Sequence, residues 1–537
     1  MHDGDGIKGE SMPRNILKVL CLALAFALLA AACAGGDSDG GSGAEGGDTD
    51  SDGSNSDGTD SDGSDSNAGE SDGSDSDGSD SDGSDTDGGD TDGSAGGDVD
   101  VSMLAGLEGE ELLEAQRAVI DQLAGTAFTC EDGDGGTPSD TATGVTADTI
   151  KIGVIIADLE LIIPLGLSVD LGDLMGEAEA VAAHINDCGG INGRMLEITE
   201  YGYPVADPDA ARAACADATE QDGNFIVMSW VLVQDTPLCV TETNETLLVA
   251  SFGGSREFYD RSDGRYISPF LPEDFAALGA IETFAENGVI TADSTVGLLW
   301  GDVVDQNVLV PDMREALEAT GATVVDGTLQ HPNPLSCAGH PEIVQSFADA
   351  GVDTVIAPLG GPCYGDFAIE GAANAFFPQY LTIAKSGMTS DVGTSKMDQA
   401  SDAFDGALGV NDSPGLNAVK DLDESPYAWD KVCHEIYAEG GVEYSFSDSD
   451  PYGAGVTWCA SLFIIVEALQ AAGTDLTQES FIEGTQTIEA VPGGADTVFT
   501  GLPEGNSHAS NGVFYTQTWD LDCTCWATVD PPFRVEL

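Results

Sequence analysis

The chain has 537 residues and a formal net charge of −80 at pH 7, because 96 acidic side chains face only 16 Lys and Arg. This charge argues against binding to nucleic acid or to an anionic lipid surface. Charge repulsion of this size destabilises a compact chain unless salt screens it, so we expect adaptation to high ionic strength; acidity for solubility alone is the weaker explanation.

Residues 1–33 are typical of an export signal. Arg14 and Lys18 precede an apolar run from Val19 to Ala32, which is short for a membrane span. The small residues before Cys33 resemble a bacterial lipobox, which implies that Cys33 is lipidated and anchors the mature chain to a membrane, although the expected leucine lies one place early. The alternative is an ordinary signal peptide cut near Ala32.

Residues 34–100 form a tether of Ser, Asp, Gly and Thr. Its central part, 36–98, holds 21 acids and no Lys or Arg. A segment with nothing to bury is predicted to be disordered and extended by its own charge. The repeats suggest calcium binding, but they lack the apolar residue and the final Glu of an EF-hand loop, so a spacer is the preferred interpretation.

Residues 101–144 follow as a helical segment. Apolar residues recur on one face over 102–125, which predicts one amphipathic helix. The pattern fits a stalk and fits a helix docked on the body, and it does not separate the two.

From residue 145 the chain alternates strands and helices. Ile150 to Ile156 is a β-branched run of the kind found in buried parallel strands, and a helix is expected from about Gly176 to Asn186. Gly189 and Gly190 end this helix, and Asn192-Gly193 turns the chain into the next strand. Further strands are expected near 225–229, 247–251, 295–300, 322–325, 354–357 and 379–383, with helices near 208–221, 275–287, 311–320 and 341–350. This alternation predicts parallel sheets covered by helices, and its length predicts two lobes.

The phrase HINDCGGINGRMLEI, after a strand and a loop, resembles the opening of periplasmic solute-binding proteins of the branched-chain amino acid transport class. The resemblance implies a type I periplasmic binding fold, in which two Rossmann-like α/β lobes are joined by a three-strand hinge. It implies a first lobe of 145–268 and 409–510 and a second of 269–408 and 511–537. It also implies a ligand held in the cleft between the lobes.

Ten cysteines remain in the exported body, an even number that favours disulfides. In the implied topology the expected pairs are Cys215–Cys239, Cys337–Cys363 and Cys433–Cys459. Cys130, Cys188, Cys523 and Cys525 would supply two more bridges, unless some stay as free buried thiols. His331 and His340 flank Cys337 and suggest a metal, but a disulfide loop with surface histidines is the preferred interpretation.

The loops after strands are the expected ligand site. Gly253, Gly254 and Ser255 are the best candidates, because the glycines would let a ligand approach the backbone and Ser255 would cap the next helix; a plain turn and cap is the equal alternative. Ser229 and Trp230 follow an earlier strand. By element order the resemblance adds Asp305, Tyr364, Lys385 and Ser386. Relatives that bind amino acids place a carboxylate near Lys385 and Ser386, so this departure weakens the case for an amino acid.

The leading hypothesis is an extracytoplasmic lipoprotein, without cofactor, metal or catalytic activity, that delivers a small polar solute to the permease subunits of an ABC transporter. No Walker motif is present, so the ATPase would be another chain. A ligand-sensing receptor of the same fold is the alternative. An enzyme is disfavoured because HExxH and GxSxG motifs are absent, and an adhesin because no wall-sorting tail follows Phe533.

Overall fold

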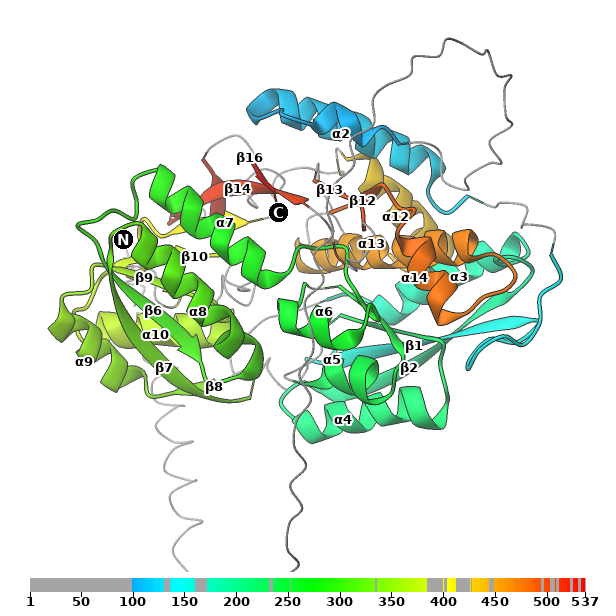
Figure 1. The fold of residues 1–537 in the computed structure, drawn as a ribbon, viewed down its shortest axis with the longest axis horizontal. Helices are drawn as coiled ribbons and strands as arrows, with labels where there is room; N and C mark the ends of the chain where they lie inside the picture. Colours follow the sequence, from blue (N-terminus) through cyan, green and yellow to red (C-terminus); the bar gives the residue numbers. More distant parts are fainter. Residues whose placement is uncertain are drawn as a thin grey trace, which may run out of the picture. The chain divides into compact units, whose positions relative to one another are not determined.

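The computed structural model shows an α/β chain built on two β-sheets (Figure 1). The signal segment, Cys33 and the tether lie outside the part that the structure describes. The described residues are 99–129, 136–159, 171–230, 235–251, 253–333, 336–383, 399, 403–411, 425, 427–443, 449–493, 497–502, 508, 511–521, 525–529 and 533–536.

The first sheet is parallel throughout and confirms the predicted strand-helix alternation. Strand β1, which lies between β2 and β3, is buried along most of its length: Ile152 and Val154 belong to the core, and Gly153 lies against Asn224. The strand order is β2 (Met195–Pro204), β1 (Thr149–Asp158), β3 (Ile226–Ser229), β4 (Leu247–Ala250) and β5 (Tyr266–Ile267).

The turn after the first long helix follows the sequence prediction. Gly189 and Gly190 have φ angles of 103° and 80°, and Asn192 and Gly193 have φ angles of 49° and 80°. These left-handed residues close the helix and reverse the chain into β2, as glycine and asparagine permit. The helices of this part are α3 (Leu174–Asp187), α4 (Pro208–Ala216), η3 (Asp217–Gln221), α5 (Thr236–Leu238), η4 (Cys239–Thr243) and α6 (Arg256–Ser262).

The second sheet has a parallel centre in the order β7, β6, β9, β10, β11, and antiparallel strands at both ends. The parallel strands are β6 (Thr295–Gly301), β7 (Thr323–Asn333), β9 (Thr354–Ala357), β10 (Gln379–Thr382) and β11 (Leu408–Asn411). The antiparallel ones are β8 (Ser336–Ala338), β12 (Ala490–Pro492), β13 (Val498–Thr500), β14 (Asn511–Asp520), β15 (Cys525–Thr528) and β16 (Phe533–Glu536). The lobe boundary expected at residue 409 falls inside β11, which pairs with β10 and β14.

Helix α8 (Val304–Ala319) corrects one prediction. The sequence analysis began this helix at Pro311, but Pro311 lies inside it. A proline there removes one backbone hydrogen bond. Burial of Leu309, Val310 and Met313 on the same helix offsets that loss. The other helices of this part are α7 (Glu273–Glu286), α9 (His340–Ala350) and α10 (Gly361–Ala373).

Three late helices return to the first sheet: α12 (Ala428–Glu439), α13 (Ser449–Ala472) and α14 (Gln478–Thr485). Helices α12 and α13 pack on α3, and α13 also contacts β4. The stretch Ala454–Ala472 is long and apolar enough to cross a membrane, yet 78% of its most apolar window is buried. It is therefore the central core helix of this part of the chain.

The N-terminal segment is docked on the body. It forms η1 (Val101–Leu104) and α2 (Gly109–Thr126), separated where Gly106 and Gly109 have positive φ angles, so the single predicted helix is two. Helix α2 packs on α12, β12 and β13, as Figure 1 shows. Gln116 Oε1 accepts a hydrogen bond of 3.0 Å from the Val498 N–H, and Phe128 stacks on Trp429.

The three expected disulfides are confirmed. Cys215–Cys239 links α4 to η4, Cys337–Cys363 links β8 to α10, and Cys433–Cys459 links α12 to α13. Cys188 and Cys525 are also disulfide-bonded. The other two cysteines expected in bridges, Cys130 and Cys523, lie outside the described residues.

Candidate functional site

The candidate site lies at the carboxyl edge of the first sheet. Strands β1, β3 and β4 run parallel, so their last residues reach the same edge, which is where open α/β sheets bind ligands. Ser229 ends β3, and Ser251 follows β4; the Ser251 N–H donates to the Ser229 carbonyl at 3.0 Å. The expected residues after these two strands are therefore brought to one edge.

Two serines at this edge carry buried hydroxyls without a hydrogen-bond partner. Ser229 is 1% exposed and Ser255 is 2% exposed, and within the part of the chain that the structure describes neither Oγ has a hydrogen-bond partner. Ser255 occupies the N-cap of α6, but its side chain makes no cap hydrogen bond, so the predicted capping role is wrong. Burying a hydroxyl without a hydrogen bond costs about 1–3 kcal/mol of folding free energy. Both hydroxyls are therefore available to bond a ligand.

Trp230 and residues of α13 extend this edge. The Trp230 side chain is half-buried, with its ring centroid 6.3 Å from that of Trp458. Trp458 Nε1 donates to the Leu174 carbonyl at the start of α3, at 2.9 Å. Ser461, one turn further along α13, pairs with Ser251 Oγ–Oγ at 2.9 Å. Helix α13 thus bridges α3 and the ends of two strands.

The contribution of α13 to this edge is not predicted by the sequence. Trp458 and Ser461 are three residues apart, so they lie on one face of the helix. This spacing is the only sign of a polar face within a long apolar run. Their sequence separation from β3 and β4 exceeds two hundred residues, so no local pattern connects them to the site.

Gly253 and Gly254 are required by the protein's own packing. A Cβ on Gly253 would lie 2.1 Å from the Leu271 carbonyl oxygen, and one on Gly254 would lie 2.8 Å from Phe258. The Gly254 carbonyl accepts from the Glu273 N–H at 3.0 Å. Both glycines are buried. The sequence predicts that a ligand approaches the backbone closely at these positions, but in the structure the residues in close contact are the protein's own Leu271 and Phe258.

A cation and two acids lie next to Ser255. The Arg256 guanidinium pairs with Asp274 on α7 and Asp312 on α8, and its Cζ lies 5.4 Å from the centre of the Phe275 ring. The Arg256 N–H donates to Asp274 Oδ1 at 3.1 Å. These pairs tie α6 to the helices that flank the second sheet, and they occupy the charge of Arg256.

The remaining expected residues belong to other elements or lie outside the described residues. Tyr364 lies in α10, is fully buried, and donates to the backbone carbonyls of Val355 at 2.8 Å and Leu381 at 3.0 Å. Burial raises the pKa of its phenol well above the usual value. Tyr364 therefore joins strands β9 and β10. Asp305 is the second residue of α8, and Lys385 and Ser386 lie outside the described residues.

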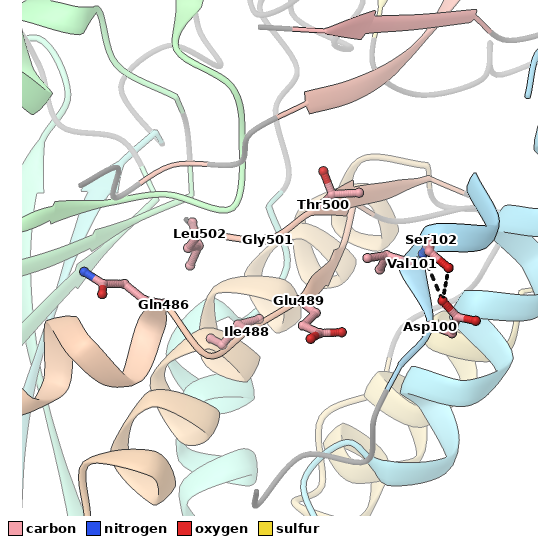
Figure 2. Close-up of a pocket in the computed structure, with 9 residues that line it drawn as sticks. All are labelled: Asp100, Val101, Ser102, Gln486, Ile488, Glu489, Thr500, Gly501 and Leu502. Carbon is pink, nitrogen blue, oxygen red and sulfur yellow. Dashed lines mark hydrogen bonds between the residues drawn. The ribbon is translucent and has the colours of Figure 1, made fainter. Parts of the chain in front are cut away.

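A pocket of about 450 Å³ lies elsewhere, where the N-terminal segment meets the strand β13 (Figure 2). Its lining includes Asp100, Ser102, Glu489, Thr500 and Leu502. Asp100 Oδ1 accepts from the Ser102 N–H at 3.1 Å. The carboxylate of Asp100 is therefore already bonded within its own segment. The lining residues give this pocket no advantage over the strand edge as a ligand site.

No family model matches the sequence, and no curated protein matches it. Solved structures do match in fold. A solute-binding protein of an ABC transporter from R. palustris, in complex with 4-hydroxybenzoate, has a TM-score of 0.54 and 16% identity over 73% of this chain and 98% of its own. A fatty acid ABC transporter substrate-binding protein from Thermomonospora curvata has a TM-score of 0.54 and 16% identity over 75% and 96% of the two chains. A branched-chain amino acid ABC transporter protein from Thermus thermophilus with bound valine has a TM-score of 0.52 and 14% identity over 72% and 96%. The chain therefore has the type I periplasmic binding fold that the sequence predicts.

Proposed function

We propose that this chain is the extracytoplasmic solute-binding component of an ABC transporter, and that it takes a small solute bearing a carboxylate or an amide. The solute would lie at the carboxyl edge of the first sheet. The observation that carries the proposal is the pair of buried hydroxyls of Ser229 and Ser255, which have no hydrogen-bond partner among the described residues. A carboxylate accepts from hydroxyls, so such a ligand would satisfy both.

The surroundings favour a solute with an apolar part beside its polar group. Trp230 offers a half-buried ring next to the candidate hydroxyls. Proteins of the same fold bind 4-hydroxybenzoate and valine, and both molecules join a carboxylate to an apolar group. Affinity would come from these groups being desolvated in a closed cleft, with Gly253 and Gly254 shaping its wall. The second lobe would add Asp305, Lys385 and Ser386.

The test is a ligand screen on the full exported chain by thermal shift, followed by calorimetry. The probes are valine, 4-hydroxybenzoate, a short fatty acid and a short amide. A true ligand raises the melting temperature by mass action. Failure of every probe to shift the melting temperature would overturn the proposal.

Three serine variants make the test specific. Ser229→Ala and Ser255→Ala each lose one hydrogen bond to the ligand, so we expect the Kd for the best probe to rise about three- to tenfold without loss of stability. Ser262→Ala is the matched control, because its buried hydroxyl already donates to the Tyr259 carbonyl at 2.9 Å. It should lose stability and keep its affinity. Equal affinities in all three variants would place the ligand elsewhere.

We also propose that Cys33 is lipidated and tethers the chain to the membrane, from which the solute would pass to permease subunits. The support is the lipobox-like run before Cys33 and the spacer after it. Labelling with a fatty acid analogue should mark the wild type and leave Cys33→Ser unmarked. Equal labelling of the two chains would contradict the anchor.

A further inference from the structure

The Cys337–Cys363 disulfide has a histidine beside it. Cys337 lies in β8, Cys363 lies in the first turn of α10, and their Cα atoms are 5.4 Å apart. One ring nitrogen of His331 and the two sulfurs all lie within 4.8 Å of one another. A nitrogen and two sulfurs so close together form a compact ligand set for a thiophilic cation.

Three separate elements hold these ligand atoms in place. Strands β7 and β8 pair antiparallel through Gln330 and Ala338, which brings His331 and Cys337 to neighbouring positions. The His331 ring packs over Gly301, where a Cβ would come within 2.9 Å of Nδ1. The third element is α10, whose first turn supplies Cys363. The three residues are therefore held near one another by separate elements, and the two sulfurs need only move apart from bonding distance to take an ion between them.

The site is reachable from solvent. His331 and Cys337 are half-buried, and Cys363 is 1% exposed. A cation would first contact His331 and Cys337, and then the more deeply buried sulfur of Cys363. The net charge of −80 also raises the concentration of divalent cations near the chain.

We propose that reduction of this disulfide opens a binding site for one zinc ion, with His331, Cys337 and Cys363 as ligands. Reduction by a phosphine breaks the S–S bond, gives each sulfur a hydrogen, and transfers the water oxygen to phosphorus as the phosphine oxide. Zinc then displaces the two thiol protons to the solvent and binds both thiolates and the imidazole. A water molecule completes the four-coordinate site.

The other two bridges described do not offer this set. Among the described residues, only the His331 cluster brings three ligand atoms together. At Cys215–Cys239 the Asn244 amide nitrogen Nδ2 lies 3.7 Å from each sulfur, and an amide nitrogen does not bind zinc. The inference is thus specific to one of three otherwise similar bridges, and it is independent of the proposed solute site.

Metal and disulfide exclude each other, because both use the same two sulfurs. Zinc would hold the pair reduced, and oxidation would expel the ion. The chain before oxidation is therefore a zinc protein, and the oxidised chain is not.

The experiment uses the full chain, reduced by a phosphine under argon, and then alkylated with and without zinc. Mass spectrometry of the peptides reports each cysteine separately. We expect zinc to slow alkylation of Cys337 and Cys363 at least about tenfold and to leave Cys215 and Cys239 unchanged. Cobalt in place of zinc should give a thiolate-to-metal absorption band with one ion per chain.

His331→Ala and His331→Gln test the third ligand. Either change should weaken zinc binding by about tenfold or more, while circular dichroism stays unchanged. The matched control is Cys215→Ser with Cys239→Ser, which should bind zinc as the wild type does. The proposal is overturned if zinc protects no cysteine or protects all of them equally. It is also overturned if reduction unfolds the chain, or if both His331 variants bind zinc with wild-type affinity.

Discussion

Arg194 and Glu177 are both ionisable side chains with no exposed surface, and the fold treats them in opposite ways. Arg194 lies where the segment before β1 meets the connection after α13. Its Nε donates to the Thr146 carbonyl at 2.8 Å, and Nη2 donates to Ser139 at 2.9 Å and Thr474 at 2.8 Å. The guanidinium thus binds three backbone carbonyls and joins these two segments.

Glu177 lies one turn into α3, on a helix that packs against α12 and α13. Neither carboxylate oxygen of Glu177 has a hydrogen-bond partner among the residues that the structure describes. Burial, helped by the nearby charge of Asp173, raises the pKa of Glu177 to about 9. The side chain is therefore a neutral acid at pH 7. A buried ionisable group stabilises a fold when backbone groups form hydrogen bonds with it. It destabilises the fold when it is buried without such hydrogen bonds.

Replacing Arg194 should give the largest effect. Arg194→Met keeps the apolar stem and strands three carbonyls, so we expect a loss of about 3–5 kcal/mol in the free energy of unfolding, measured by denaturant titration. Arg194→Lys keeps the charge but cannot reach three carbonyls with one ammonium group, and it should recover less than half of that loss. A loss under about 1 kcal/mol for Arg194→Met would show that the two segments hold together without the guanidinium.

Replacing Glu177 should act in the opposite direction and depend on pH. Below pH about 4.5 both the folded and unfolded chains hold the proton; as pH rises, the unfolded chain releases it first, so wild-type stability falls until about pH 9. Glu177→Gln removes this dependence and should stabilise the chain by about 2–4 kcal/mol at neutral pH, and by almost nothing near pH 4. Thermal unfolding across this range measures the difference.

Glu179→Gln is the control for that experiment, since Glu179 is exposed on the same helix. It should leave stability unchanged at every pH. A gain from Glu177→Gln that is equal at pH 4 and pH 8 would mean that the carboxyl titrates normally in the folded chain.

The parts of the fold that were predicted are those encoded locally. Strand β1, helix α3 and the Asn192-Gly193 turn follow from a β-branched run, a helical apolar repeat and residues that accept positive φ. The antiparallel strands β12 to β16 were not predicted. Strands β12, β13, β15 and β16 are each only three or four residues long, which is too short for an alternating pattern to be recognised. The longer β14 pairs with β11, about a hundred residues earlier in the chain, so no local pattern indicates that pairing. The start of α8 was misplaced because a proline usually marks the first turn of a helix, and here buried neighbours override it.

The candidate site was predictable only in part for the same reason. Ser229 and Ser255 follow strands, so parallel topology alone places them at one edge. Their lack of partners depends on how the surrounding chain packs, and sequence carries no sign of it. Tyr364 shows the converse, since a tyrosine in a loop-like Gly-Gly-Pro sequence is enclosed by two strands whose carbonyls use its hydroxyl.

Salt should separate the exposed charges from the two buried ones. The net charge of −80 predicts that the melting temperature rises by several degrees between about 0.1 M and about 1 M salt, because screening relieves repulsion on the surface. The differences made by Arg194→Met and Glu177→Gln should persist, since buried interactions are screened much less. A melting temperature that does not change with salt would contradict adaptation to high ionic strength.

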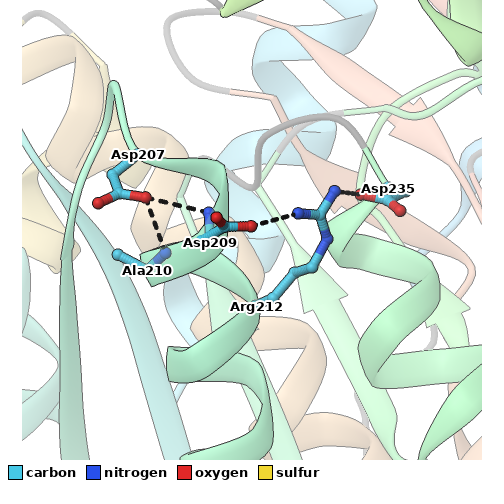
Figure 3. Close-up of polar contacts among 5 residues, drawn as sticks. All are labelled: Asp207, Asp209, Ala210, Arg212 and Asp235. Carbon is cyan, nitrogen blue, oxygen red and sulfur yellow. Dashed lines mark hydrogen bonds and ion pairs between the residues drawn. The ribbon is translucent and has the colours of Figure 1, made fainter. Parts of the chain in front are cut away.

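The smallest effect is expected at Arg212, an exposed counterpart of Arg194 (Figure 3). Arg212 pairs with Asp209 and Asp235, each at 3.0 Å, but its side chain is 45% exposed. Arg212→Met should therefore cost under about 1 kcal/mol at low salt and less at high salt.

Asp207→Ala is the useful comparison at the start of the same helix, because Asp207 caps α4 by accepting from the Asp209 and Ala210 N–H groups at 3.1 Å. Loss of that cap should cost about 1 kcal/mol at either salt concentration, since it removes hydrogen bonds to backbone donors that no other side chain serves. We attribute the larger effect expected at Arg194 to its burial and to the three carbonyls that it binds. Equal losses of stability for Arg212→Met and Arg194→Met would contradict this explanation.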